Sequence, residues 1–105
     1  MSNAPAKTPL SLEDLRARRE EILTIARRHK AYNVRVFGSV ARGEAGPDSD
    51  VDLLVNFREG ASLFDVAGLY LDLKALLGVE VDIVEDHAGL RERFRTRVVQ
   101  EMVAL

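Results

Sequence analysis

The stretch that decides the fold lies between residues 38 and 55 and reads Gly38-Ser39-Val40-Ala41-Arg42-Gly43-Glu44-Ala45-Gly46-Pro47-Asp48-Ser49-Asp50-Val51-Asp52-Leu53-Leu54-Val55. A glycine–serine turn opens a short helical segment, and ten residues separate it from an aspartate pair at the start of an apolar strand. Strand residues two apart face the same side, so Asp50 and Asp52 are expected to project together. Two adjacent carboxylates repel each other unless a cation lies between them, and such oxygen ligands suit Mg²⁺.

A third acid completes the pattern, because Asp82 lies in the otherwise apolar run Val79-Glu80-Val81-Asp82-Ile83-Val84. A lone carboxylate in such a strand is costly to bury without a partner, and the metal that Asp50 and Asp52 need would supply one. Three carboxylates on neighbouring strands can hold two Mg²⁺ ions. Backbone N–H groups of the Gly38-Ser39 turn can bind an anion. The sequence therefore predicts a Mg²⁺–nucleotide site with these three aspartates as catalytic and metal-binding residues and Gly38 and Ser39 as nucleotide-binding residues.

Each part of the pattern also has a purely structural explanation. An Asp-x-Asp pair is common at solvated strand ends, and a glycine–serine pair can simply join a strand to a helix; the conjunction of all parts is what favours the nucleotide site. Arg42 lies one helical turn past Ser39. It is therefore expected either to contact a nucleotide phosphate or to pair with Glu44 or Asp48. Ser49 is expected to fix the turn before Asp50 rather than to touch substrate.

The order of elements predicts an α/β fold, αβαβαβα, with a mixed three- to four-stranded sheet packed by helices. Ser11 and Ser62 are expected to cap the first long helix and the 62–77 helix. The link between residues 37 and 50 is too short for a parallel crossover, so the first two strands are expected to be antiparallel. The expected helices cover 11–30, 39–42, 62–77 and 88–103, and the expected strands 33–37, 50–57 and 79–84.

The length and composition of the 105-residue chain limit its domain organisation and the class of protein to which it can belong. We expect a disordered tail over residues 1–10, within which Ser2-Asn3-Ala4 resembles an expression-tag remnant, and one domain over 11–105. The absence of cysteine excludes disulfides and thiolate metal sites and fits a cytoplasmic protein. No apolar run is long enough to span a membrane. The net charge of −2 argues against direct nucleic-acid binding.

The 62–77 helix has few polar positions, and a helix that is apolar nearly all round is buried on more than one side. Such a helix is either central to the domain or contacts another subunit, whether a second copy or a different protein.

The Gly-Ser-x10-Asp-x-Asp pattern with a third strand aspartate resembles the DNA polymerase β-like nucleotidyltransferase superfamily. The local sequence is most similar to that of the minimal nucleotidyltransferases, the MntA-like antitoxin family. The similarity lies in residues 38–55, in Val81-Asp82-Ile83-Val84 and in Leu90-Arg91-Glu92-Arg93. The resemblance implies transfer of AMP from ATP to a hydroxyl, with metal on Asp50, Asp52 and Asp82 and phosphates on Gly38 and Ser39. It also implies a nearby-encoded helical HEPN ribonuclease toxin as partner, adenylylated on a tyrosine.

Two alternatives stay open at the level of sequence. One is nucleotidyl transfer to a small-molecule alcohol of the aminoglycoside kind. The other is a nucleotide-holding module that blocks its partner by occlusion alone. The 105 residues are expected to form one domain without a separate acceptor-binding domain, and the acceptor site is therefore expected to be borrowed from a partner.

Overall fold

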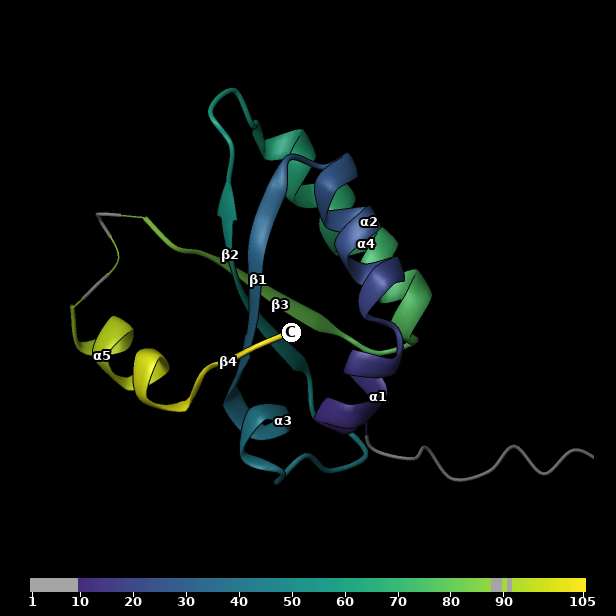
Figure 1. Ribbon diagram of the computed structural model, residues 1–105, viewed down its shortest axis with the longest axis vertical. Helices are drawn as coiled ribbons and strands as arrows, with labels where there is room; N and C mark the ends of the chain where they lie inside the picture. The colour runs from purple at the N-terminus through teal and green to yellow at the C-terminus, as the bar shows by residue number, and fades with distance from the viewer. Residues whose placement is uncertain (1–9, 88–89, 91) are drawn as a thin grey trace, which may run out of the picture.

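The computed structural model describes residues 10–105 apart from 88, 89 and 91 (Figure 1). The helices are α1 (Leu12–Ala17), α2 (Arg19–Arg28), α3 (Gly38–Arg42), α4 (Leu63–Leu77) and α5 (Glu92–Glu101), and the strands are β1 (Ala31–Phe37), β2 (Val51–Phe57), β3 (Val81–Glu85) and β4 (Val103–Ala104). Helices α2 and α4 lie side by side on one face of the sheet, and α5 lies on the other (Figure 1). The structure is therefore the predicted α/β fold with helices on both faces of a sheet.

The sheet has the strand order β3-β2-β1-β4 and is mixed. The first two strands pair antiparallel, as the short link between them predicted, and β4 also runs antiparallel to β1. Strands β2 and β3 are parallel, and Asp52 is the register partner of Asp82. Strand β3 forms one edge of the sheet, so one side of its backbone has no neighbouring strand.

The larger hydrophobic core lies between the sheet and helices α1, α2 and α4. Alternate residues of β1 and β2 point into it, including Val36 and Leu53, which are almost fully buried. Leu69 and Leu73 of α4 reach the same core from the helix side. Because strand residues alternate, Arg35, Phe37, Asp52 and Asp82 are left on the opposite face.

Local signals fix where the helices begin and end. Ser11 with Asp14, and Ser62 with Asp65, each form a capping box in which the serine and the acid satisfy backbone N–H groups reciprocally. Ser49 accepts a hydrogen bond from the Gly46 N–H at 2.8 Å, so it fixes the turn before β2 as predicted.

Close packing of α2 against α4 depends on a residue without a side chain. A Cβ at Gly68 of α4 would lie 2.5 Å from the His29 ring, so only glycine leaves room for that ring. His29 also contacts Asp72 of α4 across 2.7 Å between Nε2 and Oδ2. This contact lowers the pKa of the Asp72 carboxyl, with the His29 hydrogen bond as the largest cause.

A second, smaller core holds α5 on the other face of the sheet. Phe37, Leu54 and Val98 are buried there, and the ring of Phe94 meets Phe37 edge-on at 5.9 Å between centroids. At the far end of this face, a buried polar group anchors the segment that leads into α5.

That polar group is centred on Arg35 of β1, which is only 8% exposed. Its guanidinium donates to Asp86 at 3.1 Å and to Asn56 at 2.6 Å. Arg95 of α5 donates to the other oxygen of Asp86 at 2.8 Å. Burial of these charges is tolerated because each is paired and hydrogen-bonded, and the group joins β1, the end of β3 and α5.

The strands expected over 33–37 and 79–84 instead span Ala31–Phe37 and Val81–Glu85, and three further segments differ from the sequence expectation. The helix expected over 11–30 is broken at Arg18, whose guanidinium donates to the Leu76 carbonyl of α4. The helix expected over 88–103 spans Glu92–Glu101, and residues 88, 89 and 91 of that range lie outside the described residues; the helix ends at Glu101 because two following residues pair with β1 as β4. The tail expected over 1–10 lies outside the described residues except for Leu10, which packs against the larger core.

None of the helices in the described part of the chain has the length and apolar character needed to cross a bilayer.

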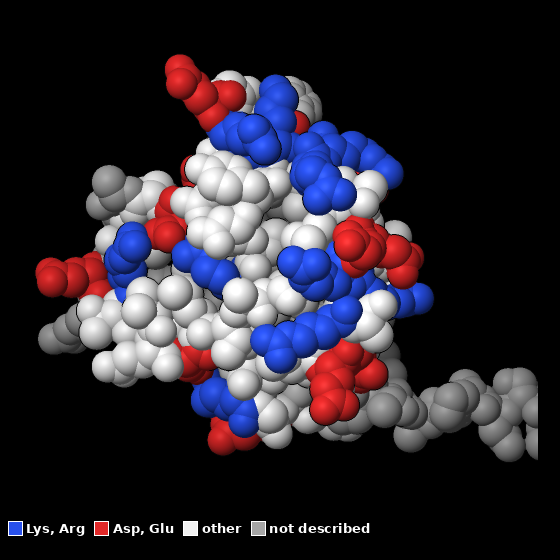
Figure 2. Space-filling model, viewed as in Figure 1, with Lys and Arg blue, Asp and Glu red and all other residues white. Residues whose placement is uncertain are grey.

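Figure 2 shows one face of the molecule, in the same view as Figure 1. Lys and Arg side chains gather on it over the part where α2 lies in Figure 1, with Asp and Glu among them. Arg18 pairs with Glu21 and Arg28 with Asp72 in this region. Acids therefore interrupt the positive charge on this face.

Candidate active site

Two of the three predicted aspartates lie next to each other on the α5 face of the sheet. Asp52 and Asp82 are partners in the parallel β2–β3 register, and neighbouring strands lie about 4.8 Å apart. Asp82 lies on the edge strand β3 and is exposed, so its carboxylate does not bear the cost of burial considered in the sequence analysis. Asp50 is also exposed and directly precedes β2, and it does not line the cavity formed by the other two.

Gly38 is in direct contact with the Asp52 carboxylate. Its φ of +74° lies in the left-handed region, which side-chain-bearing residues rarely adopt. A Cβ placed on Gly38 would overlap Oδ2 of Asp52. Both observations require glycine at this position, because the carboxylate packs against the backbone where β1 turns into α3.

These residues line one cavity of about 490 Å³. Gly38, Ser39, Asp52 and Asp82 contribute from the sheet and α3, and α5 closes the other wall. The wall residues from α5 are Phe94, Arg97 and Glu101. The sequence alone assigns no site residue to this wall, because an arginine-rich helix does not by itself show which part of the sheet it faces.

Arg42 lines the same cavity but is already paired. Its guanidinium donates to Glu44 at 2.8 Å and also to Glu101 of α5. Both carboxylates raise the pKa of Arg42, with the Glu44 hydrogen bond as the largest cause. The pairing with Glu44 that the sequence left open is present, and a phosphate contact by Arg42 stays a prediction.

The negative charges of Asp52 and Asp82 bear on whether this cavity could hold a cation. Burial, which is the largest cause, and the negative charges of Asp82 and Asp50 together raise the pKa of Asp52 to about 6. Within the described ranges, no three acidic, histidine or cysteine side chains converge closely enough to ligate one ion. The donor set of carboxylate oxygens, held together against their mutual repulsion, nevertheless fits a hard divalent cation such as Mg²⁺.

This repulsion predicts a pH-dependent gain in stability for Asp52→Asn without metal. A carboxyl whose pKa is higher in the folded than in the unfolded state destabilises the fold above about pH 6, and the penalty disappears as pH falls below the unfolded value. Discounted for the exposed part of the side chain, it is on the order of 1 kcal/mol. We expect Asp52→Asn in EDTA to melt about 4–8 °C above the unsubstituted protein at neutral pH.

The same comparison at about pH 4 should show the difference largely gone, since Asp52 is then protonated in the folded state. Differential scanning calorimetry at both pH values measures this difference in melting temperature. An equal gain at both would show that the effect comes from packing rather than from charge.

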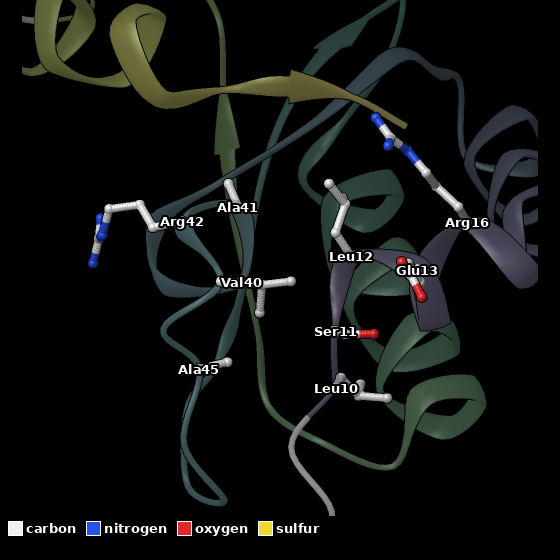
Figure 3. A pocket seen from close by; sticks show the side chains of 10 residues that line it. Leu10, Ser11, Leu12, Glu13, Arg16, Val40, Ala41, Arg42 and Ala45 are labelled. Carbon is white, nitrogen blue, oxygen red and sulfur yellow. The ribbon is translucent and has the colours of Figure 1, made fainter.

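A second pocket of about 450 Å³ lies between α1 and α3 (Figure 3). Its walls are largely apolar, with Leu10 and Leu12 facing Val40 and Ala45 (Figure 3). Arg42 borders both spaces, but in Figure 3 its side chain extends away from this pocket. The predicted site residues Ser39, Asp52 and Asp82 line the other cavity and not this pocket.

Comparison with known proteins identifies the family of the chain. Residues 19–104 match the family model described as nucleotidyltransferase domain. Protein adenylyltransferase MntA of Thermococcus cleftensis is 44% identical over 92 residues, which cover 80% of this chain and 92% of that protein.

Solved structures share the fold. A candidate minimal nucleotidyltransferase is 57% identical, with a TM-score of 0.79 over 91% of this chain and 97% of that chain. The fold is also that of a chain in the complex of a tri-AMPylated Shewanella oneidensis HEPN toxin with an MNT antitoxin, which is 19% identical with a TM-score of 0.62 over 85% of this chain and 69% of that one. The family match, the relative and the structural neighbour together show that this chain belongs to the nucleotidyltransferase family, among the minimal nucleotidyltransferases.

Proposed function

We propose that the protein transfers AMP from ATP to a hydroxyl of a partner protein, with Mg²⁺ held by Asp50, Asp52 and Asp82. The observation that carries this proposal is the register pair of Asp52 and Asp82 in one cavity with Gly38 and Ser39. Two Mg²⁺ ions at these carboxylates would neutralise phosphate charge and lower the pKa of the attacking hydroxyl.

The residues of the chain then have separate tasks. The Gly38–Ser39 turn binds phosphate through backbone N–H groups and the Ser39 hydroxyl, and Arg42 borders the cavity beside this turn while paired with Glu44 and Glu101. The acceptor oxygen attacks the α-phosphorus in line, the bond to the bridging oxygen breaks, and pyrophosphate leaves. Asp82, exposed to the cavity, accepts the proton of the attacking hydroxyl.

The acceptor that fits best is a tyrosine of a helical HEPN toxin, which makes the protein an antitoxin of the cytoplasm. The MntA relative is named a protein adenylyltransferase. The Shewanella complex pairs an AMPylated HEPN toxin with an MNT antitoxin of the same fold. The exposed apolar residues of α4, namely Leu63, Phe64 and Leu71, supply a surface for such a partner.

The proposal is tested by incubating the protein with a helical protein encoded beside it, ATP and Mg²⁺. Intact mass spectrometry is expected to show addition of AMP to the neighbour, and peptide mapping to place it on tyrosine. Modification of a small alcohol instead of the neighbour would favour the small-molecule alternative. Loss of the neighbour's activity without any addition of AMP would favour the alternative in which the protein blocks its partner by occlusion alone.

Phe64→Glu is expected to weaken partner binding by about 30-fold or more, because buried aromatic anchors contribute about 2 kcal/mol or more. Phe64 is 88% exposed, so the charge should not disturb the fold. The matched control is Val99→Glu, another exposed apolar position, on α5. Titration calorimetry with the neighbour measures both variants, and light scattering reports whether Phe64 instead mediates contact between two copies of this chain. Equal effects of the two substitutions would contradict a role for α4.

A further inference from the structure

Helix α5 presents a row of three side chains to the acid cavity. Phe94, Arg97 and Glu101 are three and four positions apart, so they lie on one face of the helix. All three line the cavity that also contains Ser39 and Asp82. Arg97 is central in this row, opposite the residues to which the nucleotide site was assigned.

The position of Arg97 is set by contacts on either side of it along the helix. Val98 is 1% exposed and packs with Phe37, which also meets the Phe94 ring. One turn further on, Glu101 accepts a hydrogen bond from Arg42 of α3. These contacts tie α5 to both the sheet and α3, so Arg97 projects from a supported helix rather than from a loop.

The charges in the cavity distinguish its two arginines. Arg42 is paired with Glu44 and Glu101, so two carboxylates already oppose its single positive charge. Arg97 is exposed, and within the described part of the chain it forms no ion pair with a carboxylate. Of these two guanidinium groups, that of Arg97 is therefore the one that is available to bind a ligand.

A nucleoside triphosphate supplies the group that such an arginine recognises. Reaction at the α-phosphate requires that phosphate to lie beside the aspartates, so the two outer phosphates must occupy another part of the same cavity. A guanidinium binds phosphate oxygens through paired hydrogen bonds and keeps its charge at any working pH. The exposed α5 wall offers that group in Arg97.

We propose that Arg97 binds the outer phosphates of the nucleotide and so holds the pyrophosphate leaving group. This inference rests on the proposed function, since it takes the nucleotide as the ligand of the cavity. It assigns α5 a direct contact with substrate, in addition to the contacts of the Gly38–Ser39 turn.

The test compares ligands that have the outer phosphates with one that lacks them. Calorimetry with Mg²⁺ is expected to show about 10- to 100-fold weaker binding of ATP and of pyrophosphate to Arg97→Ala, which is the range for a charge-assisted hydrogen bond. Affinity for AMP is expected to stay within about twofold. Arg97→Lys should recover part of the loss, because it restores charge without the paired donors.

The matched control is Gln100→Ala, an exposed α5 residue that shares a second pocket with Arg97 but does not line the acid cavity. Gln100→Ala is expected to bind all three ligands like the unsubstituted protein. Equal loss of ATP and AMP binding in Arg97→Ala, or no loss of either, overturns the assignment of Arg97 while the nucleotide site stands. Failure of the unsubstituted protein to bind ATP or pyrophosphate overturns the proposed function itself.

Discussion

Replacing Asp82 with asparagine is expected to lower the rate of AMP transfer by about a thousandfold or more. The amide has the same shape as the carboxylate but removes one of the charges that would hold Mg²⁺, and metal-ion catalysis of this kind supplies several kcal/mol. Asp82 is exposed on an edge strand, so its substitution should leave the melting temperature within a few degrees. Transfer of radiolabelled AMP to the partner and a thermal melt measure the two quantities.

Glu85→Gln is the matched control for this prediction. Glu85 is an exposed acid on the same strand, and its odd spacing from residue 82 places it on the opposite face of the sheet. It is expected to leave transfer unchanged. Near-normal turnover in Asp82→Asn would show that the third acid has a structural role only.

Gly38→Ala is expected to destabilise the protein and to remove most of its activity. A left-handed backbone costs a residue with a side chain roughly 1–2 kcal/mol, and the added methyl group would overlap Oδ2 of Asp52. The overlap must be relieved by moving the Asp52 carboxylate out of its place against Gly38, which changes its geometry relative to Asp82. A fall in melting temperature of about 10 °C and a loss of transfer of about 100-fold or more follow from these two effects.

The chain offers a control that separates the two effects. Gly43, which ends α3, has the same φ of +74°, but no heavy atom lies within 4 Å of a Cβ built there. Gly43→Ala therefore introduces the backbone strain without the overlap. We expect it to lower the melting temperature while retaining transfer activity. If both alanine variants lost activity to the same extent, the contact between Gly38 and Asp52 would not be what supports the site.

The elements that were predicted well are those with local signals. The capping boxes of Ser11 and Ser62 and the terminal glycines Gly43 and Gly78 are encoded within a few residues, and each is present in the structure. The antiparallel pairing of β1 and β2 follows from the length of the link between them. The register of Asp52 with Asp82 required knowledge of how β3 returns to the sheet, and only the fold provides it.

The α5 wall could not be predicted because its position depends on contacts between distant residues. Arg95 reaches Asp86, and Glu101 reaches Arg42, which lies 59 residues away in the chain. The sequence shows an arginine-rich helix but not the face of the sheet against which that helix packs. A signal was present in the apolar positions Phe94 and Val98, whose spacing of four gives this helix a buried side.

The placement of Asp82 on β3 has a consequence for the solubility of the protein. An edge strand presents unpaired backbone groups on which another polypeptide can add as a further strand, and charged side chains are a common barrier to such aggregation. Strand β3 carries exposed acids at both ends of its run, Asp82 and Glu85, one on each face. A second copy pairing edge to edge would bring like charges together on both faces. The carboxylate proposed to bind metal therefore also keeps the open side of the sheet from self-assembly.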